Sequence, residues 1–192
     1  MIRTGEVLHN PVTGELVQFL KTSADTNGEY VYIECVVEPN GTVAAAHIHP
    51  YQTERFEIVA GEVGFRAGQR EFVAKAGDEV VVEPGTPHKF WNAGTEEARF
   101  RCEIRPALQF EELLTTMYGL AADGKTNKKG MPNPLRMAVI ANAYLDDVRM
   151  PHVPAVLQKA ALATGAAVGR LAGYQPSYVP APAAHQPATA AA

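Results

Sequence analysis

The sequence has few cysteines, no excess of positive charge and no long apolar run, and each shortage excludes a class of protein. Its 192 residues include only two cysteines, Cys35 and Cys102, too few for a disulfide framework, so we expect both to be reduced, buried small hydrophobes. The formal net charge of −4 gives no electrostatic basis for binding a nucleic-acid phosphate backbone, so nucleic acid is not an expected partner. No uncharged apolar run reaches the roughly 18 to 20 residues that span a membrane, and residues 1–13 lack the apolar core of a secretory signal. The expected location is therefore the cytoplasm.

Residues 28–105 have the pattern of a small antiparallel β-structure. Short runs rich in Val, Ile, Phe and Tyr are separated by turn sequences such as those at 39–41 and 83–87. Turn signals at this frequency are typical of a sandwich or barrel. The expected strands are 30–38, 42–49, 54–60, 62–67, 70–75, 78–83, 88–92 and 98–105. This is about the number of strands in a small closed barrel.

The hydrophobic period changes after Pro106. Apolar residues then recur at helical spacing, first at Phe110, Leu113, Leu114 and Met117. We expect a helix to begin there and two more to cover 135–150 and 154–172. The predicted organisation is a barrel at 1–106, a helical extension at 107–173 and a disordered tail at 174–192, which is rich in Pro and Ala and carries no formal charge.

The third expected helix carries a stripe of small residues, Ala161, Gly165, Gly169 and Gly173. Small residues four positions apart permit the close approach of another surface. The stripe favours packing on the barrel or on a partner subunit, with peripheral lipid contact as the alternative. Its apolar stretch is too short to span a membrane.

The residues that carry chemistry lie between positions 41 and 92. His47 and His49, two positions apart on an expected strand, would point to the same face. A turn brings Glu54 alongside them, and His88 arrives from a later strand. Three neutral imidazoles and a carboxylate form a mixed nitrogen and oxygen site of the kind that suits first-row divalent metals.

These stretches resemble the two sequence motifs of the cupins. The first, Gly-x5-His-x-His-x4-Glu-x6-Gly, is matched at every fixed position from Gly41 to Gly61. The second, Gly-x5-Pro-x-Gly-x2-His-x3-Asn, is matched from Gly77 to Asn92, except that Glu83 stands where the family has proline. The resemblance implies an all-β fold, the double-stranded β-helix or cupin jelly-roll barrel, here with a C-terminal α-helical appendage. Because cupins commonly pair through their sheets, it also implies a homodimer.

The resemblance and the spacing together assign His47, His49, Glu54 and His88 to one divalent transition metal. Four protein ligands on an octahedral metal leave positions for water, substrate or dioxygen, which is typical of an open catalytic site. Fe(II) is the favoured metal, and Mn, Ni, Zn or Co are alternatives. His9, His152 and His185 belong to no such spacing and are expected to be solvated.

Strand parity gives candidate pocket residues, because side chains two positions from a ligand share its face. The candidates for substrate contact are Phe56, Ile58, Phe90, Phe100 and Cys102. Each could equally be barrel core. Gln52, between His49 and Glu54, is a candidate contact for substrate or water, or an exposed turn residue.

The leading functional hypothesis is a metal-dependent enzyme acting on a small, partly apolar organic molecule, most plausibly an Fe(II) oxygenase. A non-redox isomerase, cyclase or lyase would use the same metal as a Lewis acid. A metal-containing binding or sensor module without chemistry is the alternative from another class. A sugar epimerase without metal is disfavoured by the intact ligand set. No catalytic side chain beyond the metal ligands can be assigned.

Overall fold

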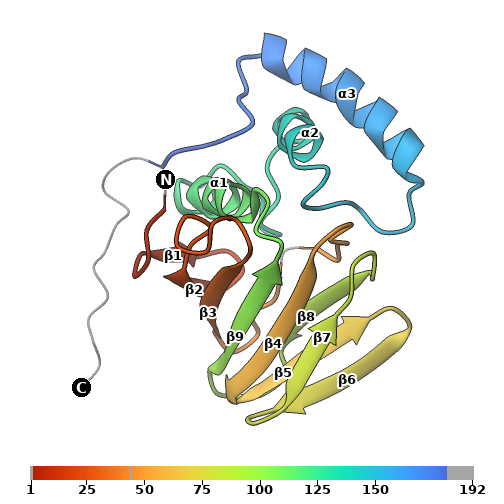
Figure 1. Cartoon of the computed structure of the whole chain (residues 1–192). Helices are drawn as coiled ribbons and strands as arrows, with labels where there is room; N and C mark the ends of the chain where they lie inside the picture. The colour runs from red at the N-terminus through yellow and green to blue at the C-terminus, as the bar shows by residue number, and fades with distance from the viewer. Residues whose placement is uncertain (1, 44, 181–192) are drawn as a thin grey trace.

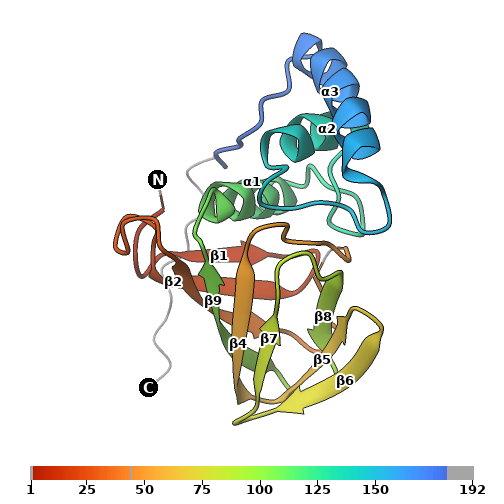
Figure 2. The same cartoon turned by 45° about the vertical axis from the view of Figure 1, so that its right-hand side comes forward.

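The computed structural model describes residues 2–43 and 45–180. Within these residues, nine strands form two antiparallel sheets that face each other (Figures 1 and 2). The larger sheet has the order β1-β2-β3-β9-β4-β7 and the smaller the order β6-β5-β8. The strands are β1 (Val7–Asn10), β2 (Glu15–Lys21), β3 (Val31–Val37), β4 (Thr53–Ala60), β5 (Glu62–Ala67), β6 (Arg70–Lys75), β7 (Glu79–Val82), β8 (His88–Asn92) and β9 (Ala98–Arg105).

The core lies between the two sheets and follows from residue alternation. In β3 every second side chain, from Val31 to Val37, is buried, because successive side chains of a strand point to opposite faces. Cys35 pairs with Phe100 of β9, so inward side chains of neighbouring strands form continuous rows. Phe56 lies 5.1 Å from Phe65 and 5.3 Å from Phe100, measured between ring centroids, in edge-on contacts.

Both cysteines are buried and unpaired, as expected. One glycine is required by a tight turn: Gly61, between β4 and β5, has φ +73°, and a Cβ there would lie 2.6 Å from the carbonyl oxygen of Glu97.

Two expectations about the strands were wrong. The strands β1 and β2 were not predicted, although β2 alternates buried and exposed residues around Val17 and Phe19. The predicted strand 42–49 is absent. Its described residues make only isolated bridges, from Thr42 and His47 to β8 and from Ile48 to Arg149. Between the two bridges to β8 this segment runs five positions, from 42 to 47, against three in β8, from 91 to 88, so it bulges and does not form a regular strand.

The helices are α1 (Phe110–Ala122), α2 (Pro134–Ala143) and α3 (Ala155–Leu171). In both ribbon views α1 lies across one end of the barrel, α2 lies on α1, and α3 is outermost. Asn133 is the N-cap of helix α2, and its side chain accepts a hydrogen bond from the backbone N–H of Arg136 at 3.0 Å. It ends at Ala143 and not at the predicted residue 150. The chain after it turns at Tyr144 and runs back toward the barrel, where Arg149 pairs with Ile48.

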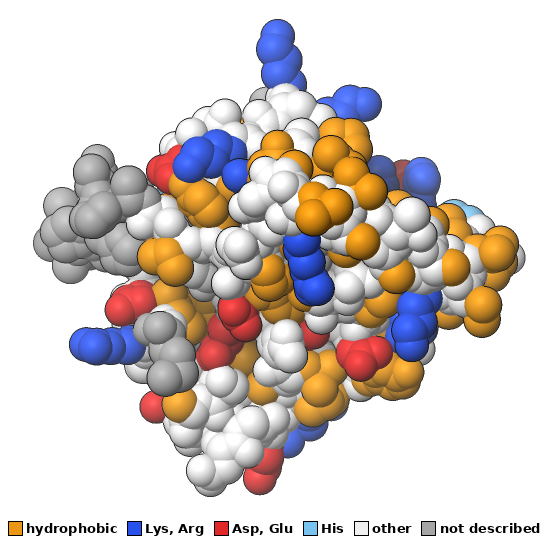
Figure 3. Space-filling model, turned by 90° about the horizontal axis from the view of Figure 1, so that it is seen from above, with side chains coloured by type: hydrophobic (Ala, Val, Ile, Leu, Met, Phe, Trp, Pro, Cys, Tyr) orange, Lys and Arg blue, Asp and Glu red, His pale blue; other side chains and the backbone are white. Residues whose placement is uncertain are grey.

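Two residues of the small-residue stripe, Gly165 and Gly169, pack against α2, whereas packing on the barrel or on a partner subunit was expected. A Cβ on Gly165 would lie 2.9 Å from Ala138, and a Cβ on Gly169 would lie 2.6 Å from Val139. The outer face of α3 is exposed; Leu171, for example, is 90% exposed. Figure 3, seen from this side, shows hydrophobic side chains among Lys and Arg side chains. Within residues 2–43 and 45–180, no helix has the length and apolar character that crossing a membrane requires.

The segment after α3 returns to α1 and α2. The Tyr178 backbone N–H donates to the Thr116 hydroxyl at 3.1 Å, and the Tyr178 hydroxyl donates to Asp123 at 2.5 Å. Asn133 donates to the Tyr174 hydroxyl at 3.1 Å. These contacts lie in the first part of the predicted tail, whose remainder, 181–192, is outside the described residues.

Candidate metal centre

Four potential ligands meet at the end of the barrel that α1 covers. His47 and His49 lie in the segment before β4, Glu54 is near the start of β4, and His88 begins β8. One ligand atom of each lies within 4.8 Å of those of the other three. His49, Glu54 and His88 are buried, and His47 is half-buried. The structure therefore brings together all four residues that the sequence assigned to a metal.

The backbone fixes two of these residues side by side. His47 and His88 exchange N–H to carbonyl hydrogen bonds of 3.0 and 2.9 Å. Their rings then lie with centroids 4.4 Å apart, and the ring of His49 is 4.9 Å from that of His47. Two segments distant in sequence thus hold their imidazoles at one point.

The orientation of all three imidazoles is set through Nδ1. This atom lies 2.9 Å from the carbonyl oxygen of Ala45 in His47, 2.6 Å from that of Asp147 in His49, and 2.9 Å from that of Thr86 in His88. A carbonyl oxygen only accepts, so each Nδ1 carries the hydrogen. Each neutral ring then has its lone pair on Nε2, which is the protonation state that a metal ligand needs.

Two buried atoms of the site lack a hydrogen-bond partner among the described residues. They are Oε2 of Glu54 and Nε2 of His88, and they lie 2.7 Å apart. With the hydrogen of His88 on Nδ1, both atoms present lone pairs to each other. Two lone pairs that face each other repel. A proton on Nε2 or a cation between the two groups removes this repulsion, and a divalent cation can accept lone pairs from all four ligands at once. The donor set therefore fits a divalent metal, which would compete with protons.

The electrostatics of the site favour the metal-binding protonation states of Glu54 and His47. Burial acts to raise the pKa of Glu54, but His49, His88 and His47 outweigh it and lower that pKa to about 2. Burial and, to a lesser extent, the neighbouring imidazoles lower the pKa of His47 to about 3. Burial also acts to lower the pKa of His88, but the Glu54 carboxylate, which would accept a hydrogen bond from the protonated ring, raises it overall. Near neutral pH the carboxylate is ionised and His47 is neutral.

Gln52 supports this cluster from behind. It is 1% exposed, so its interpretation as an exposed turn residue was wrong. Its Nε2 donates to the carbonyl oxygens of Pro106 at 2.9 Å and Ala107 at 3.2 Å, and its Oε1 lies 3.0 Å from Nδ1 of His49. It does not line the cavity described next. Its position is that of a residue that orients His49.

Asp147 is a supporting residue that sequence reasoning missed. Its carbonyl oxygen is the partner of His49, and its carboxylate accepts the backbone N–H of Gln109 at 2.8 Å, just before α1. Burial raises the pKa of this carboxyl group to about 6. Asp147 is 98 positions from His49, so no sequence motif links the two residues. Only the packing of the helices could have shown their contact.

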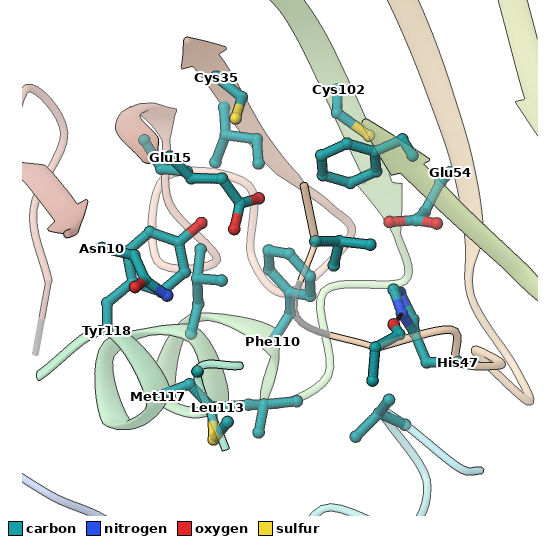
Figure 4. Close-up of a pocket in the computed structure, with 18 of the residues that line it drawn as sticks. Asn10, Glu15, Cys35, His47, Glu54, Cys102, Phe110, Leu113, Met117 and Tyr118 are labelled. Atoms are coloured by element: carbon teal, nitrogen blue, oxygen red, sulfur yellow. Dashed lines mark hydrogen bonds between the residues drawn. The ribbon is translucent and has the colours of Figure 1, made fainter. Parts of the chain in front are cut away.

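The cluster borders a cavity of about 210 Å³. Figure 4 shows His47 and Glu54 at one side of it and α1 along its base. Helix α1 contributes residues at helical spacing: Phe110, Leu113, Leu114, Met117 and Tyr118. The barrel contributes four of the predicted pocket residues, Phe56, Phe90, Phe100 and Cys102. The fifth, Ile58, is buried in the core away from the cavity, because the cavity lies toward the α1 end of β4 and Ile58 is further along that strand.

A second polar group lines the cavity, on the side away from the cluster (Figure 4). It consists of Asn10 at the end of β1, Glu15 at the start of β2, and Tyr118 of α1. Burial raises the pKa of Glu15 to about 7. These residues were not predicted. The sequence feature that could have indicated Glu15 is its position two residues before Val17, which places both side chains on the same, buried face of β2.

The remaining histidines lie outside the site. His9 and His152 are exposed, as expected, and His185 lies outside the described residues.

Comparison with known proteins places the barrel in a family. Residues 33–104 match the family model described as Cupin domain, a span that contains all four cluster residues. Similar solved structures include a predicted oxalate decarboxylase from Thermotoga maritima, at 20% identity and a TM-score of 0.48, covering 55% of this chain and 98% of that one. They also include an RmlC-like cupin from Shewanella frigidimarina, at 18% identity and a TM-score of 0.48, covering 58% and 92% respectively. The polyketide cyclase RemF from Streptomyces resistomycificus is similar at 20% identity and a TM-score of 0.44, covering 54% and 70%. No curated protein matches. By this match, residues 33–104 of the chain form a cupin domain.

Proposed function

We propose that this protein is a metal-dependent enzyme that acts on a small, largely apolar organic molecule, with Fe(II)-dependent oxygenation as its reaction class. One observation carries the proposal: the side chains of His47 and Glu54 form part of the wall of an otherwise mainly apolar cavity. A metal held by the cluster would therefore face a space that a substrate can enter.

The residues that would hold the metal are the three Nε2 atoms of His47, His49 and His88 and the carboxylate of Glu54. Bound Fe(II) would supply redox chemistry with dioxygen, and another divalent metal would supply Lewis-acid chemistry. The backbone carbonyls at Nδ1 hold the imidazoles in place, so the ligands need little rearrangement on binding.

The walls of the cavity determine which reaction class is favoured. Among the residues that the structure describes outside the cluster, the ionisable side chains lining the cavity are Glu15, Cys35, Cys102 and Tyr118. Burial raises the pKa of Cys102 and of Tyr118 well above their ordinary values, so neither exchanges protons readily near neutral pH. Glu15 lies on the far side of the cavity from the cluster. A reaction that depends little on a protein acid or base beside the metal suits this lining better than one that requires proton shuttling.

Aromatic and aliphatic side chains would exclude water from the bound molecule. Phe56, Phe90 and Phe100 line the barrel side, and Phe110 of α1 covers the cavity from the helical side. Burial of apolar surface gives roughly 25 cal/mol per Å², so a partly apolar substrate gains affinity from these walls.

The test is oxygen uptake by protein loaded anaerobically with Fe(II), measured with enol, catechol and flavonol-like compounds. We expect uptake coupled to loss of one of these compounds. Glu54→Gln should abolish the coupled uptake, whereas Glu57→Gln, on the outer face of the same strand, should retain it. Turnover without oxygen would select the non-redox class, and saturable binding without turnover would select a binding or sensor module.

A further inference from the structure

We propose that Glu15, Asn10 and Tyr118 form a recognition site for a hydroxyl group of the substrate, at the end of the cavity opposite the metal cluster. The inference rests on the proposed function, because it takes the metal site to bind the other end of the same molecule. The predicted substrate class is a molecule with an oxygen-based metal-binding group at one end, an apolar middle and a hydroxyl group at the other end.

The three side chains converge from separate elements. Asn10 and Glu15 are direct cross-strand neighbours in the β1–β2 pair, where facing side chains lie close together. Tyr118 reaches them from α1, and Figure 4 shows its hydroxyl directed toward the Glu15 carboxylate. All three are at least nine-tenths buried, yet they border the cavity.

Glu15 has acceptor capacity to spare. The hydroxyl of Thr13 donates to Oε2 of Glu15 at 2.7 Å, and Tyr118 is its second hydrogen-bonding partner. A carboxylate offers about four acceptor positions, so these contacts leave room for a further donor. A buried carboxylate is costly unless its acceptors are used. Glu15 could accept the hydrogen bond from Thr13 without bordering the cavity. It does border the cavity, as Val17 of the same strand does, so the contact with Thr13 does not by itself explain its position.

Asn10 provides the complementary donor. Its Oδ1 accepts the backbone N–H groups of Val12 at 3.1 Å and Thr13 at 3.3 Å, which fixes the direction of the amide. Its Nδ2 donates to no residue that the structure describes, and Asn10 borders the cavity. A hydroxyl group can accept from this amide and donate to Glu15 at the same time, whereas an ammonium group can only donate. The Asn10 donor beside the Glu15 acceptor therefore favours a hydroxyl group as the bound group.

The test measures binding of two series of alkanoyl hydroxamates, of increasing chain length, to the metal-loaded protein. One series ends in a hydroxyl group and the other in a methyl group with the same number of heavy atoms. The hydroxamate provides the metal-binding end. At about pH 8, above the raised pKa of Glu15, we expect the hydroxyl compound of one chain length to bind about tenfold more tightly than its methyl counterpart. This gain is the worth of a hydrogen bond to a buried charged group. A third series ending in an amine should gain less than the hydroxyl series.

Variants assign that gain to this site. Glu15→Met should abolish it, and Tyr118→Phe should reduce it, while Glu57→Gln on the outer face of β4 should leave it unchanged. If Glu15→Met does not fold, the wild-type series still shows whether a hydroxyl group is preferred, and Tyr118→Phe still shows whether that preference comes from this site. The inference is overturned if no chain length shows a hydroxyl preference, if the amine series gains more, or if the preference survives in the Glu15 variant. Failure of every hydroxamate to bind in a metal-dependent way would instead count against the proposed function itself.

Discussion

The Nδ1 of His49 donates a hydrogen bond to the carbonyl oxygen of Asp147, 2.6 Å away and 98 positions later in the chain. Two residues further on, Arg149 and Ile48 exchange backbone hydrogen bonds of 2.9 Å in both directions. The segment between α2 and α3 therefore holds the loop that carries two potential metal ligands. In this protein the helical extension is part of the metal centre and not only a cover over the barrel.

A proline at position 149 tests this coupling. Arg149→Pro removes the backbone N–H that binds Ile48, and we expect metal affinity to fall about tenfold or more, as for other losses of groups that orient ligands. The control is Arg149→Ala, which removes the same side chain but keeps the N–H. Equal metal affinity in the two variants, measured by competition with a chelator, would show that the linker does not hold the site.

Loss of the Gln52 amide should weaken both the fold and the metal site. Gln52→Leu leaves the carbonyl groups of Pro106 and Ala107 without their donor, so we expect the free energy of unfolding to fall by about 1–3 kcal/mol. It also removes a partner of His49, so metal affinity should fall about tenfold or more. Tyr51→Leu, at an exposed neighbouring position, should change neither quantity. Urea unfolding and metal titration measure the two effects, and an unchanged metal affinity in Gln52→Leu would refute the orienting role.

The stability contributed by Glu15 should depend on pH. Burial raises its pKa from the ordinary 4.5 to about 7, so between these values the folded protein holds a proton that the unfolded chain has lost. Stability from this group is therefore complete below pH 4.5 and is lost as the pH rises through 7. Glu15→Gln stays neutral throughout. Relative to wild type it should gain on the order of 2 to 3 kcal/mol between about pH 5 and about pH 8, measured by urea unfolding. A difference that does not vary with pH would mean that Glu15 is not desolvated.

The contact between α2 and α3 depends on Gly169. A Cβ at this position would lie 2.6 Å from Val139 and 2.7 Å from the carbonyl oxygen of Leu135. Overpacking costs about 1–3 kcal/mol and helix propensity returns up to about 1, so we expect Gly169→Ala to destabilise the protein by about 1–2 kcal/mol. Thr164→Ala, on the exposed face of the same helix, should not destabilise it. A more stable Gly169→Ala variant would show that the helices are not in close contact there.

Local pattern predicted much of the barrel and the composition of the cluster. Turn signals located β3 to β9 within a few residues, and in β3, β4, β7 and β9 the alternation of buried and exposed side chains supports them. The fixed spacing of His47, His49, Glu54 and His88 identified the cluster, even though the segment carrying His47 and His49 is not a regular strand. The bridges of this segment to β8 and to Arg149 are tertiary contacts that strand propensity does not capture.

The parts that sequence missed depend on contacts between distant segments. Asp147 reaches His49 only because α2 ends early, and Tyr118 reaches Glu15 only because α1 crosses the barrel end. In β2 the phase of alternation places Glu15 inside and Leu16, at 40% exposure, outside, the reverse of what hydrophobicity favours. The homodimer and the cytoplasmic location stay predictions.

The central claim is that His47, His49, Glu54 and His88 bind one divalent metal. The most direct measurement is elemental analysis of protein purified without added metal, for wild type, His47→Ala and Glu54→Ala. We expect close to one transition metal per chain in wild type and a sharp loss in both variants, each still folded because the barrel has its own apolar core. Stoichiometric metal retained in both variants would contradict the assignment of the site.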